Sequence, residues 1–333
     1  MPLDIPTRSI LLWALLALAL PSTVLGEASS DSTRSAMAAT VPTLPPPRVA
    51  GYLQVRETVE GGVGLTALLN RARFSIDGAL PSGFSYRLLT ELEASAGRTA
   101  PATVSLREAI ARWSRAPFTL TAGEFKTPFT REYLIPVPAL ELAELATAID
   151  SLAPKYDVGV MAEYTYGALA ALQIGAFNGE GANTTANRDS AVLVVGRLTA
   201  RPLAPLALGA SATHERGDSL RWAIDASVQQ WGATVRAEYL TRHVRGRARA
   251  NDDFGWSVLE SMRILLRVQF VARQEDFQRP LRGTARRLRG LAWGTNGDIV
   301  PNRVRILLEM SRRIGGRAQA HADAFLAQIQ TQF

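Results

Sequence analysis

Over most of the chain, apolar and polar residues alternate with a period of two, and turn residues separate the alternating runs. In residues 221–230, Trp222 and Ile224 belong to the apolar set, while Asp225 and Ser227 belong to the polar set. Successive side chains of a β-strand point to opposite faces of its sheet. Each run therefore predicts a strand that has one apolar face and one polar face.

The length of these runs favours a transmembrane β-barrel over a soluble sheet. A soluble antiparallel sheet also alternates, because one face packs on a core and the other meets water. Soluble strands average about 5 to 6 residues, whereas tilted strands that cross a bilayer need about 9 to 11. We expect about sixteen strands, an even number as in bacterial barrels. They are residues 48–57, 66–78, 84–95, 103–114, 117–126, 156–165, 169–178, 189–200, 203–214, 220–230, 232–243, 254–261, 264–274, 287–296, 302–312 and 321–333.

The start of the chain does not follow this pattern. Arg8 precedes an apolar run at residues 10–20, and the small-residue site VLG follows at residues 24–26. This order is typical of a cleaved secretory signal, which we expect over residues 1–26. The next stretch, residues 27–47, is rich in Ser, Ala, Thr and Pro, and it predicts a disordered leader.

The barrel is then expected over residues 48–333. The sequence contains no cysteine, so no disulfide stabilises the exported chain. After the signal, no apolar run approaches the roughly 20 residues that a membrane-spanning helix needs. The sequence therefore excludes a helical membrane protein.

A long connection at residues 127–155 is the third of the predicted long loops. Leu140, Leu142, Leu145 and Ile149 are spaced so that they can share one face of a short helix. Structureless loops of this length are uncommon unless they are functional. The loop is either an external cap or a segment that folds into the lumen and sets the width and charge of a pore.

The last predicted strand alternates up to Phe333, with Phe325 and Ile329 on the face opposite Gln328 and Gln330. In a closed barrel this strand must pair with the first one, because an open edge in lipid leaves backbone groups unsatisfied.

Residues 120–134, LTAGEFKTPFTREYL, resemble the strand and third loop of the phosphate-selective porin O and P family of bacterial outer-membrane channels. The residues at matching places are Gly123, Phe125, Pro128, Phe129 and Glu132. Further similar stretches are residues 69–74 (LNRARF), 105–109 (SLREA), 157–160 (DVGV) and 174–181 (IGAFNGEG). The resemblance extends over residues 48–333.

This resemblance implies an outer-membrane, sixteen-stranded homotrimer with an inward-folded third extracellular loop. The implied solutes are small anions such as phosphate and phosphorylated or carboxylated compounds. Phe333 is similar to the terminal residue through which the barrel assembly machinery recognises its clients, so this machinery and outer-membrane lipid are the other expected partners. Members with strong phosphate preference line the pore with arginines and lysines. Since Lys126 and Lys155 are the only lysines here, the expectation is a general anion preference.

If the apolar faces meet lipid, the polar faces line the lumen. Guanidinium groups bind phosphate and carboxylate with two parallel hydrogen bonds. The arginines expected on the pore wall are Arg71, Arg73, Arg87, Arg107, Arg236, Arg267, Arg273, Arg303 and Arg305. Lys126 and Arg131, at the start of the long loop, are expected at the constriction, with Glu124 and Glu132 beside them.

Ion pairing is an equal alternative to a basic lumen. Several carboxylates are expected to point the same way as the arginines and to neutralise them. They are Asp77, Glu91, Glu93, Asp225, Glu238 and Glu309.

The sequence predicts neither an enzyme nor a cofactor. His214, His243 and His321 are the only histidines and are far apart, so a zinc cluster with close ligand spacing is missing. No nucleophile elbow or P-loop motif is present.

Two other interpretations stay open. One is a closed structural or adhesive barrel without conductance. The other is a secreted basic β protein that binds nucleic acid or polysaccharide, as the net charge of +7 allows. Of these, we expect a nucleic-acid partner least.

Overall fold

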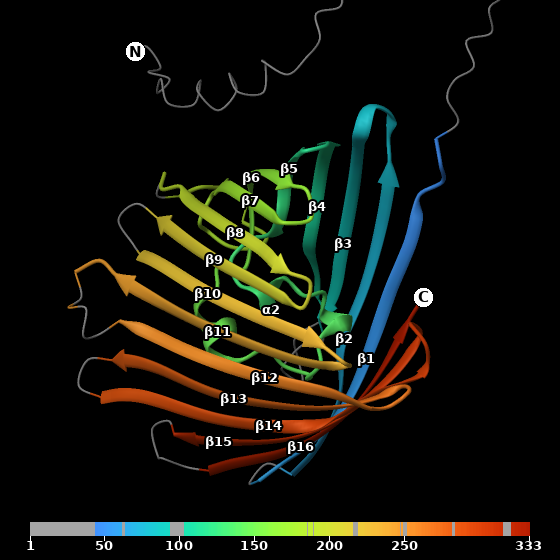
Figure 1. The fold of residues 1–333 in the computed structure, drawn as a ribbon, viewed down its shortest axis with the longest axis vertical. Coiled ribbons are helices and arrows are strands. Elements are labelled where there is room, and N and C mark those ends of the chain that lie inside the picture. Colours follow the sequence, from blue (N-terminus) through green and yellow to red (C-terminus); the bar gives the residue numbers. More distant parts are fainter. Residues whose placement is uncertain are drawn as a thin grey trace, which may run out of the picture. The chain divides into compact units, whose positions relative to one another are not determined.

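The computed structural model describes residues 44–333, except 62–63, 94–102, 185, 189, 216–218, 247, 249–251, 282–283 and 316–320. The predicted signal peptide and residues 27–43 of the predicted leader lie outside the described residues. Within the described part, sixteen antiparallel strands pair in chain order into one closed barrel (Figure 1). They are β1 (Arg48–Glu60), β2 (Gly64–Ala79), β3 (Phe84–Glu93), β4 (Thr103–Arg115), β5 (Phe118–Lys126), β6 (Tyr156–Tyr166), β7 (Ala170–Phe177), β8 (Leu193–Leu203), β9 (Leu206–Glu215), β10 (Ser219–Gln230), β11 (Ala233–Val244), β12 (Asp253–Leu265), β13 (Val268–Leu281), β14 (Thr284–Val300), β15 (Val304–Gly315) and β16 (His321–Gln332).

The predicted strands are confirmed in number and order. The larger differences lie at hairpin turns, where the alternation continues through residues that leave the sheet. A strand was expected at 264–274, but β12 continues to Leu265, and Leu266 and Arg267 form the turn before β13. The predicted turn at Arg201 and Pro202 lies inside β8 instead, at an irregular register with β9. A proline is tolerated there because the ladder is already interrupted.

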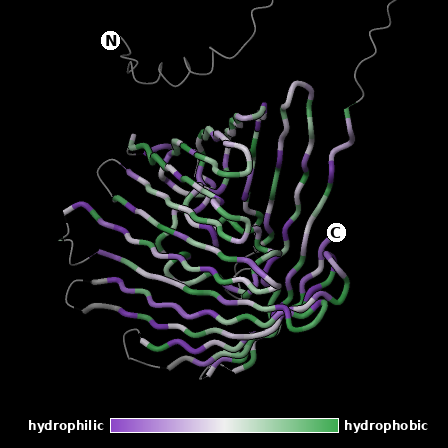
Figure 2. The backbone as a smooth tube through the Cα atoms, viewed as in Figure 1, coloured by the Kyte–Doolittle hydropathy of each residue, from purple (hydrophilic) through white to green (hydrophobic). Residues whose placement is uncertain are grey.

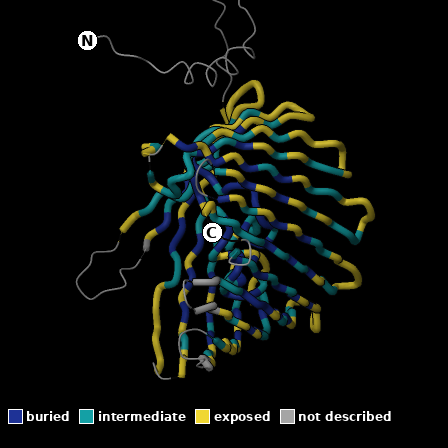
Figure 3. The backbone as a smooth tube through the Cα atoms, turned by 90° about the vertical axis from the view of Figure 1, so that its left-hand side faces the viewer, coloured by how far each residue is buried: buried dark blue, intermediate teal, exposed yellow. Residues whose placement is uncertain are grey.

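Polar side chains are buried in this barrel and apolar side chains are exposed. In β1, Gln54 and Arg56 are 2% and 8% exposed, whereas the alternating Leu53 and Val55 are 44% and 47% exposed. The same alternation of hydropathy and of burial runs along the other strands (Figures 2 and 3). A soluble sheet buries its apolar face in a core, so this distribution excludes the soluble alternative. The apolar set forms the outer wall, and the polar set faces the enclosed space.

The first and last strands close the barrel. β1 pairs with β16 from Tyr52 opposite Gln332 to Glu60 opposite Ala324. Beyond this ladder, the backbone groups of Gly51 and Phe333 bond to each other in both directions, at 3.0 and 3.1 Å. The described strands thus leave no open edge, as a wall in lipid requires.

The connection between β5 and β6, residues 127–155, is the long segment that the sequence singles out. It contains α2 (Arg131–Leu134), the 3-10 helix η2 (Val137–Ala139) and α3 (Thr147–Leu152). A second 3-10 helix, η1 (Pro81–Gly83), forms the turn between β2 and β3.

The helical prediction for this segment is wrong in detail. Leu140, Leu142 and Leu145 lie between η2 and α3, and of the four residues only Ile149 is helical. The backbone carbonyls of this stretch accept hydrogen bonds from barrel side chains, which takes the place of helical pairing. Among the described residues, no helix is long and apolar enough to cross a membrane.

Candidate functional site

The start of the segment at residues 127–155 is held by a buried ion-pair triad. Arg131 Nε lies 2.7 Å from one carboxylate oxygen of Asp225 on β10, and Arg197 of β8 lies 2.7 Å from the other. The Asp225 side chain is 1% exposed. A buried carboxylate is costly unless it is paired, and here the two arginines provide that pairing.

The middle of the segment is held by arginines of β11, β13 and β15. Arg236 forms an ion pair with Glu141 at 2.9 Å. Arg273 donates a hydrogen bond to the backbone oxygen of Glu144 at 2.6 Å, and Arg305 donates to two backbone oxygens of the segment at 3.1 Å. These three predicted pore-wall arginines therefore bind protein rather than open solvent.

Carboxylates of the same strands accept hydrogen bonds from the segment's backbone. Glu309 of β15 accepts from the Ala143 amide at 2.9 Å. Glu275 of β13 accepts from both the amide and the hydroxyl of Thr147, at 2.9 and 2.7 Å. Hydrogen bonds to charged groups contribute about 1.5 to 3 kcal/mol each. The three hydrogen bonds therefore fix the segment against β13 and β15.

An apolar cluster joins α2 and α3 to the strands. Its buried members are Phe129, Tyr133, Ala146, Ala148, Ile149, Leu152 and Ala153 from the segment, with Ala223, Leu240 and Phe277 from the strands. The contact with β12 is especially close at Gly255, where an added methyl group would overlap the Ala148 side chain. Only glycine leaves room for α3 at this distance.

Glu132 lies at the centre of this packing. It accepts a hydrogen bond from the Ala146 amide at 3.2 Å and from Arg273 at 3.3 Å. Burial raises the pKa of the Glu132 carboxyl, outweighing the opposite effects of Arg273 and Arg236.

Lys126, the last residue of β5, also binds the segment. Its ammonium group donates to the backbone oxygens of Tyr133 and Ile135, at 2.6 and 3.2 Å. It lies 4.8 Å from the centre of the Tyr133 ring and 6.0 Å from that of Tyr156. Lys126 therefore positions the segment, and its charge stays at the wall of the cavity described next.

A cavity of about 890 Å³ remains between the segment and strands β2 to β5. On the strand side, Glu91 of β3 receives three guanidinium groups: Arg71 at 3.6 Å, Arg73 at 3.1 Å and Arg107 at 2.5 Å. Within the described part, five basic side chains line the cavity: the three arginines, Lys126 and Lys155. Three acidic side chains line it as well: Glu91, Asp150 and Glu180. The strand-side wall is therefore positively charged.

The segment forms the other wall of this cavity, and that wall is largely apolar. Its apolar part consists of Tyr133, Ile135, Val137, Leu140 and Leu145. Asp150 and Lys155, which form an ion pair at 2.8 Å, complete it. Burial raises the pKa of the Tyr133 hydroxyl, so the group stays protonated and can donate a hydrogen bond.

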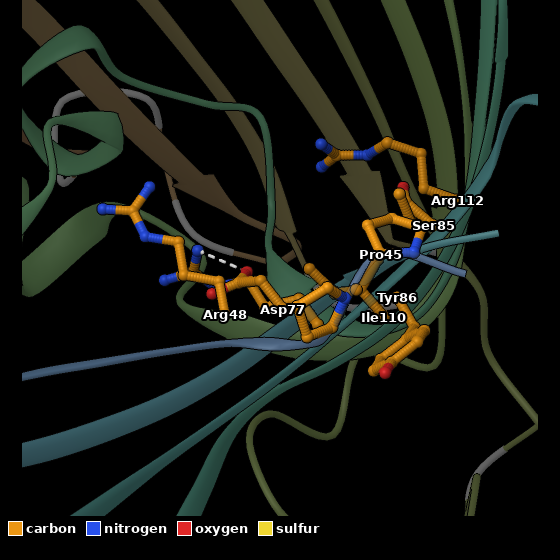
Figure 4. Close-up of a pocket in the computed structure, with 11 residues that line it drawn as sticks. Pro45, Arg48, Asp77, Ser85, Tyr86, Ile110 and Arg112 are labelled. Atoms are coloured by element: carbon orange, nitrogen blue, oxygen red, sulfur yellow. Dashed lines mark hydrogen bonds and ion pairs between the residues drawn. The ribbon is translucent and has the colours of Figure 1, made fainter. Parts of the chain in front are cut away.

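A smaller cavity of about 380 Å³ lies near the beginning of β1, beside β2 to β4. Arg48, Arg87 and Arg112 line it together with Asp77 (Figure 4). Arg87 pairs with Asp77 at 3.0 Å and with Glu108 at 2.7 Å. Arg87 is thus neutralised by two ion pairs.

The structure divides the predicted site residues into three groups. The first group lines the large cavity: Arg71, Arg73, Arg107 and Lys126. The second binds the segment or belongs to it: Arg131, Arg236, Arg273 and Arg305. The third lies elsewhere: Arg87 at the smaller cavity, and Arg267 and Arg303, exposed in turns.

Arg267 and Arg303 were expected on strands of the pore wall, but both lie in turns. Both continue the alternation of the neighbouring strand in sequence, but the chain reverses at these residues and both are exposed. The expected ion pairs of Asp77 and Glu91 with pore-wall arginines are confirmed. Asp225 pairs instead with Arg131 and Arg197, and Glu238 and Glu309 accept hydrogen bonds from backbone amides of the segment. The side chain of Glu93 lies outside the described part.

Two arginines that contact the segment were not predicted. Arg56 of β1 pairs with Glu144, and Arg197 of β8 donates to the Phe129 carbonyl at 2.7 Å. Both occupy inward positions of their strands. Their places in the apolar–polar alternation could therefore have identified them. Within the described residues, no group of three or more His, Asp or Glu is arranged to hold a metal ion.

Comparisons with known proteins point to outer-membrane barrels. The family model of phosphate-selective porin O and P matches residues 52–246, more than half of the chain. A loop L8 deletion mutant of OmpT, an outer membrane protein of Vibrio cholerae, aligns with a TM-score of 0.67 at 12% identity, covering 86% of this chain and 99% of that one. No curated protein sequence matches.

Two porins of known structure are also similar in fold. The anion-selective porin from Comamonas acidovorans has a TM-score of 0.62 at 10% identity, with 86% and 99% of the two chains covered. A mutant of the Rh. blastica porin has a TM-score of 0.62 at 14% identity, with 86% and 100% covered. At these identities the likeness establishes the barrel fold.

Proposed function

Because the chain belongs to the phosphate-selective porin O and P family, we propose that it is a passive outer-membrane channel for small anions. The observation that carries the proposal is the large cavity, where Arg71, Arg73 and Arg107 converge on the single carboxylate of Glu91. Excess positive charge in an enclosed aqueous space lowers the barrier to anions. The solutes are phosphate and small phosphorylated or carboxylated compounds.

The constriction is formed by residues 127–155, folded inward. Two observations support this: the segment binds inward side chains of distant strands, as with Arg236 and Glu141, and it forms one wall of the large cavity. Lys126 then acts mainly by holding the segment through two backbone oxygens. Arg71, Arg73 and Arg107 supply the charge that solutes meet.

Export and assembly follow the same proposal. Residues 1–26 act as a cleaved signal, and Phe333 is the contact for the barrel assembly machinery. The chain functions as a homotrimer in outer-membrane lipid, like the trimer form recorded for OmpT of Vibrio cholerae. Family and fold are those of a channel, so no catalytic role is proposed.

A closed, non-conducting barrel is the second candidate. The segment binds strands β8, β10, β11, β13 and β15, and so covers much of the far wall. If the large cavity does not continue through the barrel, the protein is structural.

Planar lipid bilayers distinguish the two candidates. Purified protein is expected to produce stepwise currents, and a potassium chloride gradient should give a reversal potential of the sign for chloride preference. Stable insertion without current would favour the closed barrel. Currents that prefer potassium would contradict the anion channel.

A further inference from the structure

The large cavity has two chemically different walls. Strands β2 and β4 present Arg71, Arg73 and Arg107, whereas residues 133–145 present Ile135, Val137 and Leu145 among other uncharged side chains. A hydrated inorganic anion gains nothing from an apolar wall, because displacing water from it is favourable only for an apolar partner. The combination fits a solute that is itself charged at one end and apolar at the other.

The apolar wall results from the orientation of the segment's glutamate side chains, which form ion pairs with strand arginines. Glu132 and Glu141 contact Arg273 of β13 and Arg236 of β11. Glu144 contacts Arg56 of β1. The cavity side of the same stretch, from residue 133 to residue 145, is left with uncharged residues. This segregation fixes both the position of the segment and the character of its free face.

The guanidinium groups of the basic wall differ in how far they are exposed to the cavity. The Arg73 side chain is only 9% exposed, and its Nε atom has no hydrogen-bond partner in the described part of the chain. The Tyr133 hydroxyl, on the opposite wall, also has none there. Both atoms are buried, so a solute carboxylate meets the basic wall mainly through Arg71 and Arg107, whose side chains are 26% and 23% exposed.

We infer that the cavity prefers organic monocarboxylates with an aromatic or branched aliphatic body over inorganic phosphate. The carboxylate lies against Arg71, Arg73 and Arg107, and the apolar body lies against Ile135, Val137 and Leu145. This inference rests on the proposed anion channel, and it names the solute class that the channel favours.

The expected size of the preference follows from buried area. Burial of roughly 60 Å² of a ring against the segment, at about 25 cal/mol per Å², corresponds to a tenfold difference in affinity, or about 1.4 kcal/mol. Benzoate and acetate carry the same charged group, so the ring is what distinguishes them.

The test measures block of single-channel chloride current by benzoate, acetate and inorganic phosphate in planar bilayers at neutral pH. Benzoate is expected to block at about a tenfold lower concentration than acetate, and at a lower concentration than phosphate. Equal block by benzoate and acetate, or strongest block by phosphate, would overturn the inference while leaving the anion channel intact. Absence of current or preference for potassium would instead contradict the proposed function.

Variants of the apolar wall separate the ring's contribution from that of the charge. Val137→Thr and Leu145→Asn keep the number and branching of the side-chain heavy atoms, and both should bring benzoate block close to that of acetate without changing acetate block. Ala139→Ser, at an exposed residue of the same segment outside the cavity lining, is the matched control and should change neither. If both wall variants leave benzoate block intact, or weaken block by the two anions equally, the apolar wall does not select the solute.

Discussion

Arg236 of β11 and Glu141 of the β5–β6 segment, 95 residues apart in sequence, form a two-pronged ion pair with hydrogen bonds of 2.9 and 3.2 Å. Both side chains are nearly buried, at 10% and 13% exposure. The pair therefore ties the segment to β11.

Arg236→Ala should destabilise the segment by about 3 to 5 kcal/mol, because it leaves a buried carboxylate without its partner. The expected signs are faster tryptic cleavage within residues 127–155 and noisier single-channel current. Arg312→Ala is the matched control, since it removes an equally charged residue from an exposed pair with Asp323 and should change neither measurement. The same cleavage rate in both variants would show that the pair does not fix the segment.

Arg107→Gln should lower the chloride-to-potassium permeability ratio by about fivefold, because a unit charge about 4 Å from an ion in water contributes about 1 kcal/mol. Reversal potentials in a salt gradient measure this ratio. Arg267→Gln removes the same charge from an exposed turn and should leave the ratio nearly unchanged. Comparable shifts for the two variants would mean that net charge, and not the cavity wall, determines selectivity.

Gly255→Ala should displace α3, since the added methyl group meets the Ala148 side chain and the backbone oxygen of Asp276. Overpacking of this kind costs about 1 to 3 kcal/mol. Conductance and protease sensitivity of the segment should both change. Gly196→Ala is the control, because an added methyl group there meets open space, and a shift in that variant too would point to glycine flexibility instead.

Stability of the folded protein should depend on the protonation of Glu132. Its pKa in the folded protein is raised above the ordinary value of 4.5. Between pH 4.5 and the raised pKa, the folded state therefore binds more protons than the unfolded state. The contribution to the free energy of unfolding is fully present below 4.5 and is lost as pH rises through the raised pKa.

Glu132→Gln should therefore flatten the pH profile of the free energy of unfolding, measured in denaturant from about pH 4 to about pH 8. The amide keeps an oxygen for the Ala146 backbone N–H and cannot ionise. The difference between the two profiles isolates Glu132 from the other acids, and parallel profiles would show that its ionisation does not change on folding.

Ile224→Arg should lower the free energy of unfolding of the vesicle-inserted barrel by about 2 to 4 kcal/mol if the residue lies near the bilayer midplane. Ile224 is on the outer face and 52% exposed. Trp231→Arg, in the turn after β10 and 93% exposed, should cost about 0 to 1 kcal/mol. Equal folding yields would contradict the lipid-facing assignment of the apolar set.

The strands were predictable because a period of two directly encodes which side chains face lipid. Arg267 shows the limit of that signal: it continues the alternation between Leu266 and Val268, yet the chain reverses there. Alternation alone does not mark a tight turn when the turn residues themselves alternate. Closure between β1 and β16 was predictable from the cost of an open edge in lipid.

The division of the arginines was not predictable from alternation. Arg73 and Arg273 both occupy inward positions, but Arg73 lines the cavity and Arg273 binds the Glu144 carbonyl. What separates them is the side of the barrel on which residues 127–155 lie, and that depends on packing between residues far apart in sequence. The same long-range contacts override the helical spacing of Leu140 and Leu142.

The pairing of β1 with β16 has a kinetic consequence. Arg56 and Gln328, 272 residues apart, become neighbours only when the two outermost strands meet. Such a high contact order slows folding, since the loop-closure entropy is lost before the contact contributes. We therefore expect β1 and β16 to pair last. Before they pair, the barrel is an open sheet with two unpaired edge strands, which must be protected from aggregation.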